Sequence, residues 1–129
     1  MIIKISPDEL AKNQALEPEW YKGQVVAFEA KSSADGKSTN YIPTVKIEKD
    51  GRQLDYYFNS KALGMMEAFA AVVNEVSVAD IRKTGVEVDS EKAIGKKVKV
   101  HLIQEPYQGR INNKIDNWLP YDSDTQPAF

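Results

Sequence analysis

The feature that most constrains the fold is the stretch of residues 23–59, where apolar and polar side chains alternate in successive short runs. In the first run Val26, Phe28 and Ala30 fall on one side, with the period of two that is typical of a half-buried β-strand. Residues 32–40 contain no large apolar side chain, so they predict a flexible polar loop. The first constraint is therefore a strand that leads into a long polar finger.

Two more strands follow this finger. The alternation resumes over residues 41–49, and Asp50-Gly51 is a dipeptide that favours a tight hairpin turn. Residues 53–59 then return antiparallel to the preceding strand. The sequence thus predicts a three-stranded meander whose inward side chains are Val26, Phe28, Val45, Ile47, Leu54, Tyr56 and Phe58.

The opposite face of this meander is expected to carry Lys31, Thr44, Lys46 and Tyr57. A cation that binds phosphate beside an aromatic face that stacks on a base is the combination that single-stranded nucleic acid requires. Tyrosine and lysine on an exposed strand also serve β-propensity and solubility alone, so the pattern leaves both interpretations open.

A strongly apolar segment, residues 60–74, follows the meander and predicts a helix with Ser60 as its N-cap. Its apolar positions recur at helical spacing and are Leu63, Met65, Met66, Phe69, Ala70, Val72 and Val73. Such a helix is expected to close the open end of a curled sheet. Two shorter helical segments are predicted at residues 77–84 and 89–94, each followed by a glycine.

The sheet is expected to resume with strands over residues 96–105 and 110–120. The alternation places Val98, Val100, Leu102, Ile111 and Ile115 inward. The side chains expected to point outward are Lys97, Lys99, His101, Asn112, Lys114, Asp116 and Trp118. Tyr21 and Lys22 lead into the first strand, where the tyrosine could stack on a base and Trp20 could cap the core.

Composition restricts the function classes. The chain has 129 residues, of which 42% are hydrophobic and 28% charged, as expected of one globular domain. It lacks an apolar run long enough for a membrane span or a signal peptide, so we expect a cytoplasmic protein. It has no cysteine and one histidine, which disfavours disulfides, metal sites and catalytic triads, and we expect no cofactor.

Charge is segregated along the chain although the net charge is only −2. Residues 75–91 carry five acidic and two basic side chains, whereas residues 96–114 carry five basic side chains and one acidic. A locally basic surface can therefore coexist with an acidic isoelectric point. The alternative is that these lysines only solvate one strand face.

The order of elements is strand, long loop, strand, tight turn, strand, helical insert, strand, loop, strand. This is the order of an OB-fold, a five-stranded Greek-key β-barrel that binds oligonucleotides through its second and third strands and its first and fourth loops. We expect an N-terminal arm at residues 1–19, the barrel at residues 20–121 and a disordered acidic tail at residues 122–129. The two binding loops, residues 31–40 and 105–110, carry or adjoin Lys37, Tyr41, Tyr107 and Arg110.

The successive segments PEWYKGQVVAFEAKSSADGKSTNYIPTVKIE, YYFNSKALGMMEAFAAV and GKKVKVHLIQEPYQGRINNKIDNWLP carry a family resemblance. Its motifs are residues 20–23, the pair Gly95-Lys96 and residues 109–113. The chain resembles phage-encoded single-stranded DNA-binding proteins with an OB-fold, which act in replication and recombination. The resemblance implies a protein that coats single-stranded DNA without sequence specificity, in the host cytoplasm.

The candidate DNA contacts combine aromatic faces, cations and one amide. They are Tyr21, Lys22, Lys31, Lys37, Tyr41, Lys46, Tyr57, Lys99, Tyr107, Arg110, Asn112, Lys114 and Trp118. In the tail, Asp122 and Asp124 precede a terminal Phe129, an arrangement similar to the acidic, Phe-ended tip with which such proteins recruit replication partners. A plain solubilising tail is the alternative.

Two other classes of function are alternatives to DNA binding. A magnesium-dependent nuclease requires clustered carboxylates, and the sequence shows no such cluster, so we expect a protein that is not an enzyme. An OB-like protein-interaction or structural phage module without nucleic-acid binding remains the stronger alternative, because a fold does not fix a function. An open barrel edge could also pair two copies into a homodimer.

Overall fold

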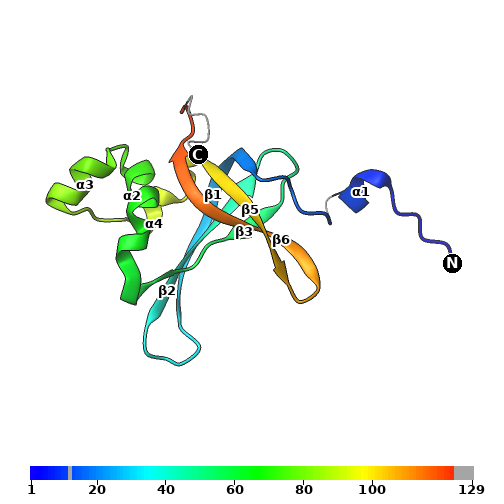
Figure 1. Ribbon diagram of the computed structural model, residues 1–129, viewed down its shortest axis with the longest axis horizontal. Helices are drawn as coiled ribbons and strands as arrows, with labels where there is room; N and C mark the ends of the chain where they lie inside the picture. The colour runs from blue at the N-terminus through cyan, green and yellow to red at the C-terminus, as the bar shows by residue number, and fades with distance from the viewer. Residues whose placement is uncertain (12, 124–129) are drawn as a thin grey trace.

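The computed structural model describes residues 1–11 and 13–123 and is mainly β (Figure 1). Its antiparallel six-stranded sheet has the order β3-β2-β1-β5-β6. The sixth strand, β4, pairs with β2 at residues 40–41, next to the part of β2 that pairs with β3. The strands are β1 (Glu19–Ser32), β2 (Thr39–Ile47), β3 (Gln53–Asp55), β4 (Phe58–Asn59), β5 (Lys97–Tyr107) and β6 (Arg110–Pro120). The predicted β-rich architecture is confirmed, and this open sheet is compatible with a barrel-like fold.

The helices lie together at one end of the molecule, apart from α1 (Figure 1). They are α1 (Pro7–Ala11), the 3-10 helix η1 (Ser60–Met66), α2 (Glu67–Asn74), α3 (Val78–Thr84) and α4 (Ser90–Ala93). The two short helices predicted at 77–84 and 89–94 are confirmed, with Ser77 and Asp89 as their side-chain caps. No single helix in the described ranges has the length and apolarity to cross a membrane, although a pair bent by 116°, Ser60–Asn74 with Val78–Thr84, meets that test jointly.

The prediction of one continuous helix over residues 60–74 is partly wrong. The chain first forms η1, in which Ala62 leaves helical geometry, and only then α2. Asn59, and not Ser60, accepts the capping hydrogen bond from the backbone N–H of Lys61. Leu63 and Met65, expected in the core, are 52% and 68% exposed because this irregular segment turns them outward.

The core lies between the sheet and α2, and aromatic rings form its centre. The Phe69 ring centroid lies 5.4 Å from that of Phe58 and 4.8 Å from that of Trp118. The side chains predicted to face inward that are fully buried are Val45, Ile47, Phe58, Val98, Val100, Leu102 and Ile115. Phe28, Leu54 and Tyr56 pack against this core as half-buried side chains, so most of the predicted inward face is confirmed.

Two β-bulges account for the wrong predictions at Val26 and Trp118. In β1 the register with β2 shifts at Val26, which is 36% exposed although the alternation placed it inward. In β6 the register with β5 shifts at Asp116, so Ile115 and Trp118 both point into the core. A bulge inserts one unpaired residue and reverses the alternation beyond it, which explains why Trp118 is buried instead of exposed.

His101 and Ile111 also differ from the prediction. His101 is only 7% exposed, because two neighbours cover its ring. The Trp20 ring packs edge-on against it with the two ring centroids 5.2 Å apart, and Asp116 Oδ1 lies 2.6 Å from His101 Nδ1. Ile111 is 54% exposed, because the end of the β5–β6 hairpin projects beyond the core.

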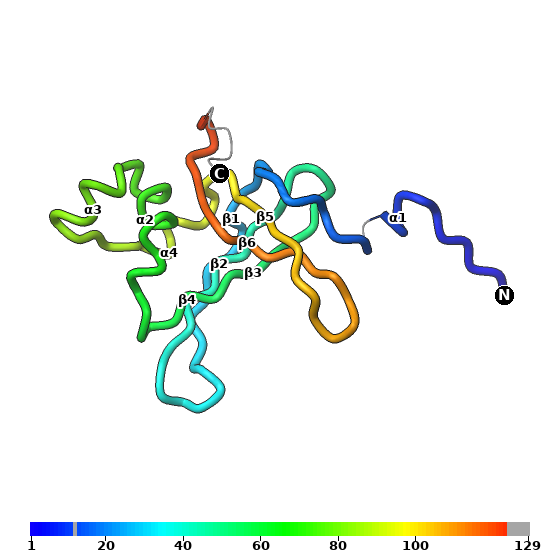
Figure 2. The backbone as a smooth tube through the Cα atoms, viewed as in Figure 1, coloured from blue at the N-terminus to red at the C-terminus, as the bar shows by residue number. Residues whose placement is uncertain are grey.

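The N-terminal residues leave the body on the side opposite the helices (Figure 2). Before β1 begins, the chain is fixed to the β5–β6 hairpin at Leu16, whose backbone N–H donates to Asn113 Oδ1 at 2.8 Å. The Leu16 carbonyl accepts from the side-chain amides of Asn113 and Gln104. The segment just before β1 is therefore part of the body, whereas α1 and the residues before it extend away from it.

Candidate nucleic-acid interface

A polar groove of about 680 Å³ lies at the β5–β6 hairpin, between residues 13–15, β3 and β6. Its polar lining consists of Asn13, Gln14, Arg52, Arg110, Asn112 and Asn113. Leu54 and Ile111 add apolar surface. Guanidinium groups bind phosphate oxygens, and amides donate to and accept from base edges, so this lining suits a nucleotide chain.

Arg52 and Asn113 form a fixed wall of the groove. The Arg52 side chain donates through Nε to Asp50 Oδ2 at 2.7 Å and through Nη1 to Asn113 Oδ1 at 3.1 Å. Asn113 is further held by its bonds to the Leu16 backbone. These groups are held by the protein itself, and Asp50 neutralises the Arg52 guanidinium, so they contribute mainly the shape of the groove.

Arg110 and Asn112 are the side chains of the groove that are available to bind a ligand. Both are exposed, and neither makes a side-chain hydrogen bond or ion pair with residues 1–11 or 13–123. Strand pairing places Arg110 opposite Tyr107, which is 59% exposed. A free guanidinium next to an exposed aromatic ring can bind a phosphate while the ring stacks on the neighbouring base.

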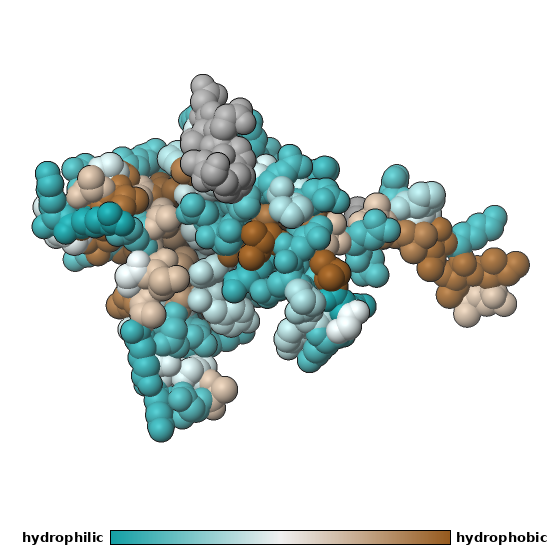
Figure 3. Space-filling model, viewed as in Figure 1, coloured by the Kyte–Doolittle hydropathy of each residue, from teal (hydrophilic) through white to brown (hydrophobic). Residues whose placement is uncertain are grey.

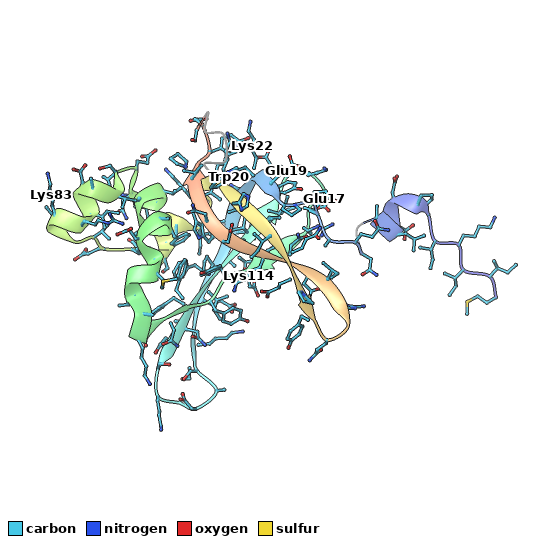
Figure 4. The ribbon with its side chains drawn as sticks, viewed as in Figure 1. Glu17, Glu19, Trp20, Lys22, Lys83 and Lys114 are labelled. Atoms are coloured by element: carbon cyan, nitrogen blue, oxygen red, sulfur yellow. The ribbon has the colours of Figure 1, made fainter. Side chains whose placement is uncertain are left out.

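Lys114 extends this surface along β6. The β5–β6 register pairs it with Ile103, on the face that Tyr107 and Arg110 share, and its Nζ lies 3.9 Å from Glu105 Oε2. That long ion pair between half-exposed side chains is weak and leaves the ammonium accessible. Figure 4 shows Lys114 near the middle of the molecule, away from Lys83 at the helical end.

The β1–β2 finger carries the next two predicted contacts. Lys31 is exposed near the end of β1, with Nζ 3.4 Å from Glu29 Oε2, and Lys37 is exposed in the turn. The turn is ordered by Asp35, which accepts from the Ser33 hydroxyl and the Lys37 backbone N–H. These two hydrogen bonds lower the pKa of Asp35.

The predicted tyrosines divide into exposed and buried ones. Tyr57 is 60% exposed, between β3 and β4, and is therefore available for stacking together with Tyr107. Tyr41 is half-buried and packs against the core. Tyr21 is 7% exposed and its hydroxyl donates to the Glu17 carbonyl at 2.7 Å. Burial, with the nearby carboxylates of Glu19 and Glu17, raises the pKa of Tyr21.

The placement of Tyr21 and Trp118 corrects the predicted site. Both were expected to reach a bound base, and both belong to the hydrophobic core. Alternation alone made Trp118 an outward residue, whereas the bulge in β6 turns it inward. Neither ring can stack on a nucleotide while the domain stays folded.

A second basic surface, here called the basic strip, lies across β2, β1 and β5. It consists of Lys22, Lys46, Lys97 and Lys99: the register pairs Lys22 with Lys99, and Gln24 lies between Lys46 and Lys97. Figure 4 shows Lys22 near the start of β1, well apart from Lys114. The predicted cations therefore lie in three places: the β5–β6 hairpin, the β1–β2 finger and the basic strip.

Tyr121 lies over the basic strip and was not predicted as a site residue. The Nζ atoms of Lys22 and Lys97 lie 5.0 and 5.3 Å from its ring centroid, and its hydroxyl donates to Glu48 Oε1 at 3.3 Å. That hydrogen bond, more than burial, raises the pKa of Tyr121. Lys99 Nζ donates to the Ser123 carbonyl. The sequence signal that could have identified Lys97 was its two-residue spacing from Lys99.

Of the predicted tail contacts, Asp122 is exposed directly after Tyr121, and Asp124 and Phe129 lie outside the described residues. Within residues 1–11 and 13–123, no three histidine, aspartate or glutamate side chains are grouped so that they could hold a metal ion. No family model matches the chain, and no curated protein matches it as a relative.

Proposed function

We propose that this protein is an OB-fold protein that binds single-stranded DNA without sequence specificity, as phage proteins of replication and recombination do. The strand order supports the fold assignment. If β3 and β4, which both pair with β2, are counted as one interrupted strand, the sheet has five strands, with the helices between the third and the fourth. The two OB-fold binding loops then correspond to the β1–β2 and β5–β6 connections.

The observation that carries the proposal is the polar groove at the β5–β6 hairpin, with Arg110 unpaired within the described ranges and Tyr107 exposed beside it. Figure 3 shows the β1–β2 finger and the β5–β6 hairpin standing apart, with the surface hollowed between them. The finger carries the exposed Lys31 and Lys37, and β6 carries the exposed Arg110 and Lys114, so a strand that bridges the finger and the hairpin has cations available on both.

Exposed tyrosines make the proposal specific for single strands. Tyr57 and Tyr107 offer aromatic faces that only unpaired bases can use, because the faces of paired bases are stacked inside a duplex. Stacking tolerates any sequence, because every base has an aromatic face. Sequence-tolerant binding is the expected result.

The test is fluorescence anisotropy of labelled oligo-dT at several salt concentrations, with a duplex of equal length as competitor. If about four cations meet phosphates, log K should fall with log salt at a slope of roughly −3. Equal affinity for the duplex, or an affinity that does not change with salt concentration, would contradict the proposal. No detectable oligonucleotide binding even at low salt would favour the alternative, an OB-like protein-interaction module.

A matched pair of lysine variants localises the interface. Lys114→Ala should reduce the salt slope by about 0.7, the value for one phosphate contact on a single strand. Lys83→Ala removes the same charge at the helical end (Figure 4) and should leave the slope unchanged. Equal effects of the two variants would mean that net charge, and not the proposed groove, governs binding.

A further inference from the structure

The first residues of the chain form an apolar arm that the described body does not cover. Ile2, Ile3 and Ile5 are 87%, 76% and 60% exposed, and Met1 is fully exposed. Figure 3 shows this arm as a continuous hydrophobic surface projecting from the body. Single exposed apolar residues are ordinary, but a contiguous run of them marks an interaction segment.

An apolar groove of about 560 Å³ lies at the other end of the molecule, between the β1–β2 pair and the helices. Its apolar lining includes Phe28, Tyr41, Leu63, Met66, Ile81 and Val86. Leu63 and Val86 are 52% and 41% exposed, so the groove is open to a ligand. Arg82 on α3 donates through Nε and Nη2 to the Glu67 carboxylate on α2, both at 2.8 Å, and fixes one side of the groove.

Charge complements this match of apolar surfaces. Residues 75–91, which include α3 and the adjoining wall of the groove, carry five acidic and two basic side chains. Residues 1–6 carry Lys4 and no acidic side chain. The charged lining of the groove is the mutually paired Glu67 and Arg82, so an arm docked there would bring Lys4 close to this acidic segment and not to an unpaired carboxylate in the groove.

Position decides which molecule supplies the arm. The arm and the helices lie at opposite ends of the long axis (Figure 1), so the arm of one molecule points away from its own groove. We propose that residues 1–5 of one copy dock in the apolar groove of a second copy, which joins copies head to tail. Such a contact is heterologous, so it leaves one arm and one groove free at the two ends of an open assembly and none free in a closed ring. It stands whether or not the protein binds DNA.

Disulfide trapping tests this contact directly, because the natural sequence contains no cysteine. The double variant Ile3→Cys/Val86→Cys, kept at increasing concentration under a mild oxidant, should give a ladder of dimers, trimers and larger species on non-reducing gels. The control Ile3→Cys/Ala79→Cys places the second thiol on an exposed position of α3 that does not line the groove, and it should give no ladder.

Sedimentation velocity supplies the second measurement. The unmodified chain should associate as its concentration rises, and the triple variant Ile2→Ser/Ile3→Ser/Ile5→Ser should stay monomeric with an unchanged thermal melt. Ile111→Ser, at another exposed apolar position on the β5–β6 hairpin, should associate like the unmodified chain.

Three outcomes would overturn the inference. One is a cross-linked monomer, which would show that the arm fills its own groove. Another is a ladder of equal strength from the Ala79→Cys control. The last is an unmodified chain that remains monomeric at every concentration tested.

Discussion

Gly23 lies where three strands meet, paired with Ile47 of β2 on one side and Val98 of β5 on the other. A Cβ atom at this position would lie 2.8 Å from Val45 Cγ1 and 2.9 Å from the Lys46 carbonyl oxygen. Backbone held by two ladders cannot move aside easily, so close packing and not a special backbone angle requires glycine here.

Gly23→Ala should therefore destabilise the domain by about 1–3 kcal/mol, the usual cost of overpacking. Gly64→Ala is the matched control, because its new methyl group would have no neighbour within 4 Å. Urea denaturation of both variants measures the difference. Equal midpoints would show that the sheet relaxes around the added methyl.

Two aromatic residues of adjacent elements should separate stability from binding. Trp118→Ala empties a core position that is 5% exposed and should cost about 3–5 kcal/mol of stability. Tyr107→Ala removes a 59% exposed ring and should change stability by less than about 0.5 kcal/mol. It should weaken oligo-dT binding by about 1–3 kcal/mol. Thermal melts and anisotropy titrations of both variants check this division, and the reverse pattern would contradict the site.

At the scale of elements, the two neighbouring asparagines of β6 have different structural roles. Asn113 ties β6 to Leu16 and accepts from Arg52, whereas Asn112 is exposed. Asn113→Ala leaves backbone groups of Leu16 without partners and should cost about 1–3 kcal/mol. Asn112→Ala should cost less than about 0.5 kcal/mol. Hydrogen exchange at residues 13–17 should accelerate only in the Asn113 variant; acceleration in both would mean that the link is not specific.

The connection between α2 and α3 should depend on pH. The hydrogen bond from Arg82 lowers the pKa of Glu67 from its usual 4.5. Because the folded-state pKa is the lower one, the contribution to stability is present above pH 4.5 and is lost as the pH falls through the folded-state value. Amide exchange in α3 should accelerate on acidification, and Glu67→Gln should remove that dependence. An unchanged pH response in Glu67→Gln would assign the effect to other carboxylates.

Alternation predicted most strands and failed where a strand contains a bulge. Val45, Ile47, Val98 and Val100 point inward as expected because their strands are regular there. Val26 and Trp118 do not lie on their predicted sides, because an alternation with a period of two gives no sign of an inserted residue.

The candidate site was predictable only in part for a related reason. Sequence reasoning identified the exposed Tyr57 from strand alternation, and Tyr107 and Arg110 from their place in or beside a predicted binding loop. It could not identify Arg52, whose place in the groove depends on pairing with Asp50 and on contact with a strand far along the chain. Tyr121 was missed because it follows the last strand and touches lysines of two others.

At the scale of the whole molecule, the tail should be separable from the body. Trp118 is the last buried side chain among the described residues, and Asp122 is exposed. A chain ending at Tyr121 should keep its stability within about 0.5 kcal/mol. It should hold or tighten oligo-dT binding at low salt, because Asp122 and Asp124 no longer compete for the basic strip, and it should lose capture of a replication or recombination partner. Loss of DNA binding, or unchanged partner capture, would contradict a role for the tail.

The length of β1 has a consequence for how this protein can diverge. Its first residues, 19–24, form the ladder with β5, and residues 23–32 form the ladder with β2, so the two ladders share only Gly23 and Gln24. Beyond Phe28 the strand pairs with β2 alone and leaves the core. Insertions or deletions in pairs at the tip would therefore lengthen or shorten the finger in register while the interior remained untouched. Natural variants of this sequence should accordingly differ in size at the finger while the residues around Gly23 keep their spacing.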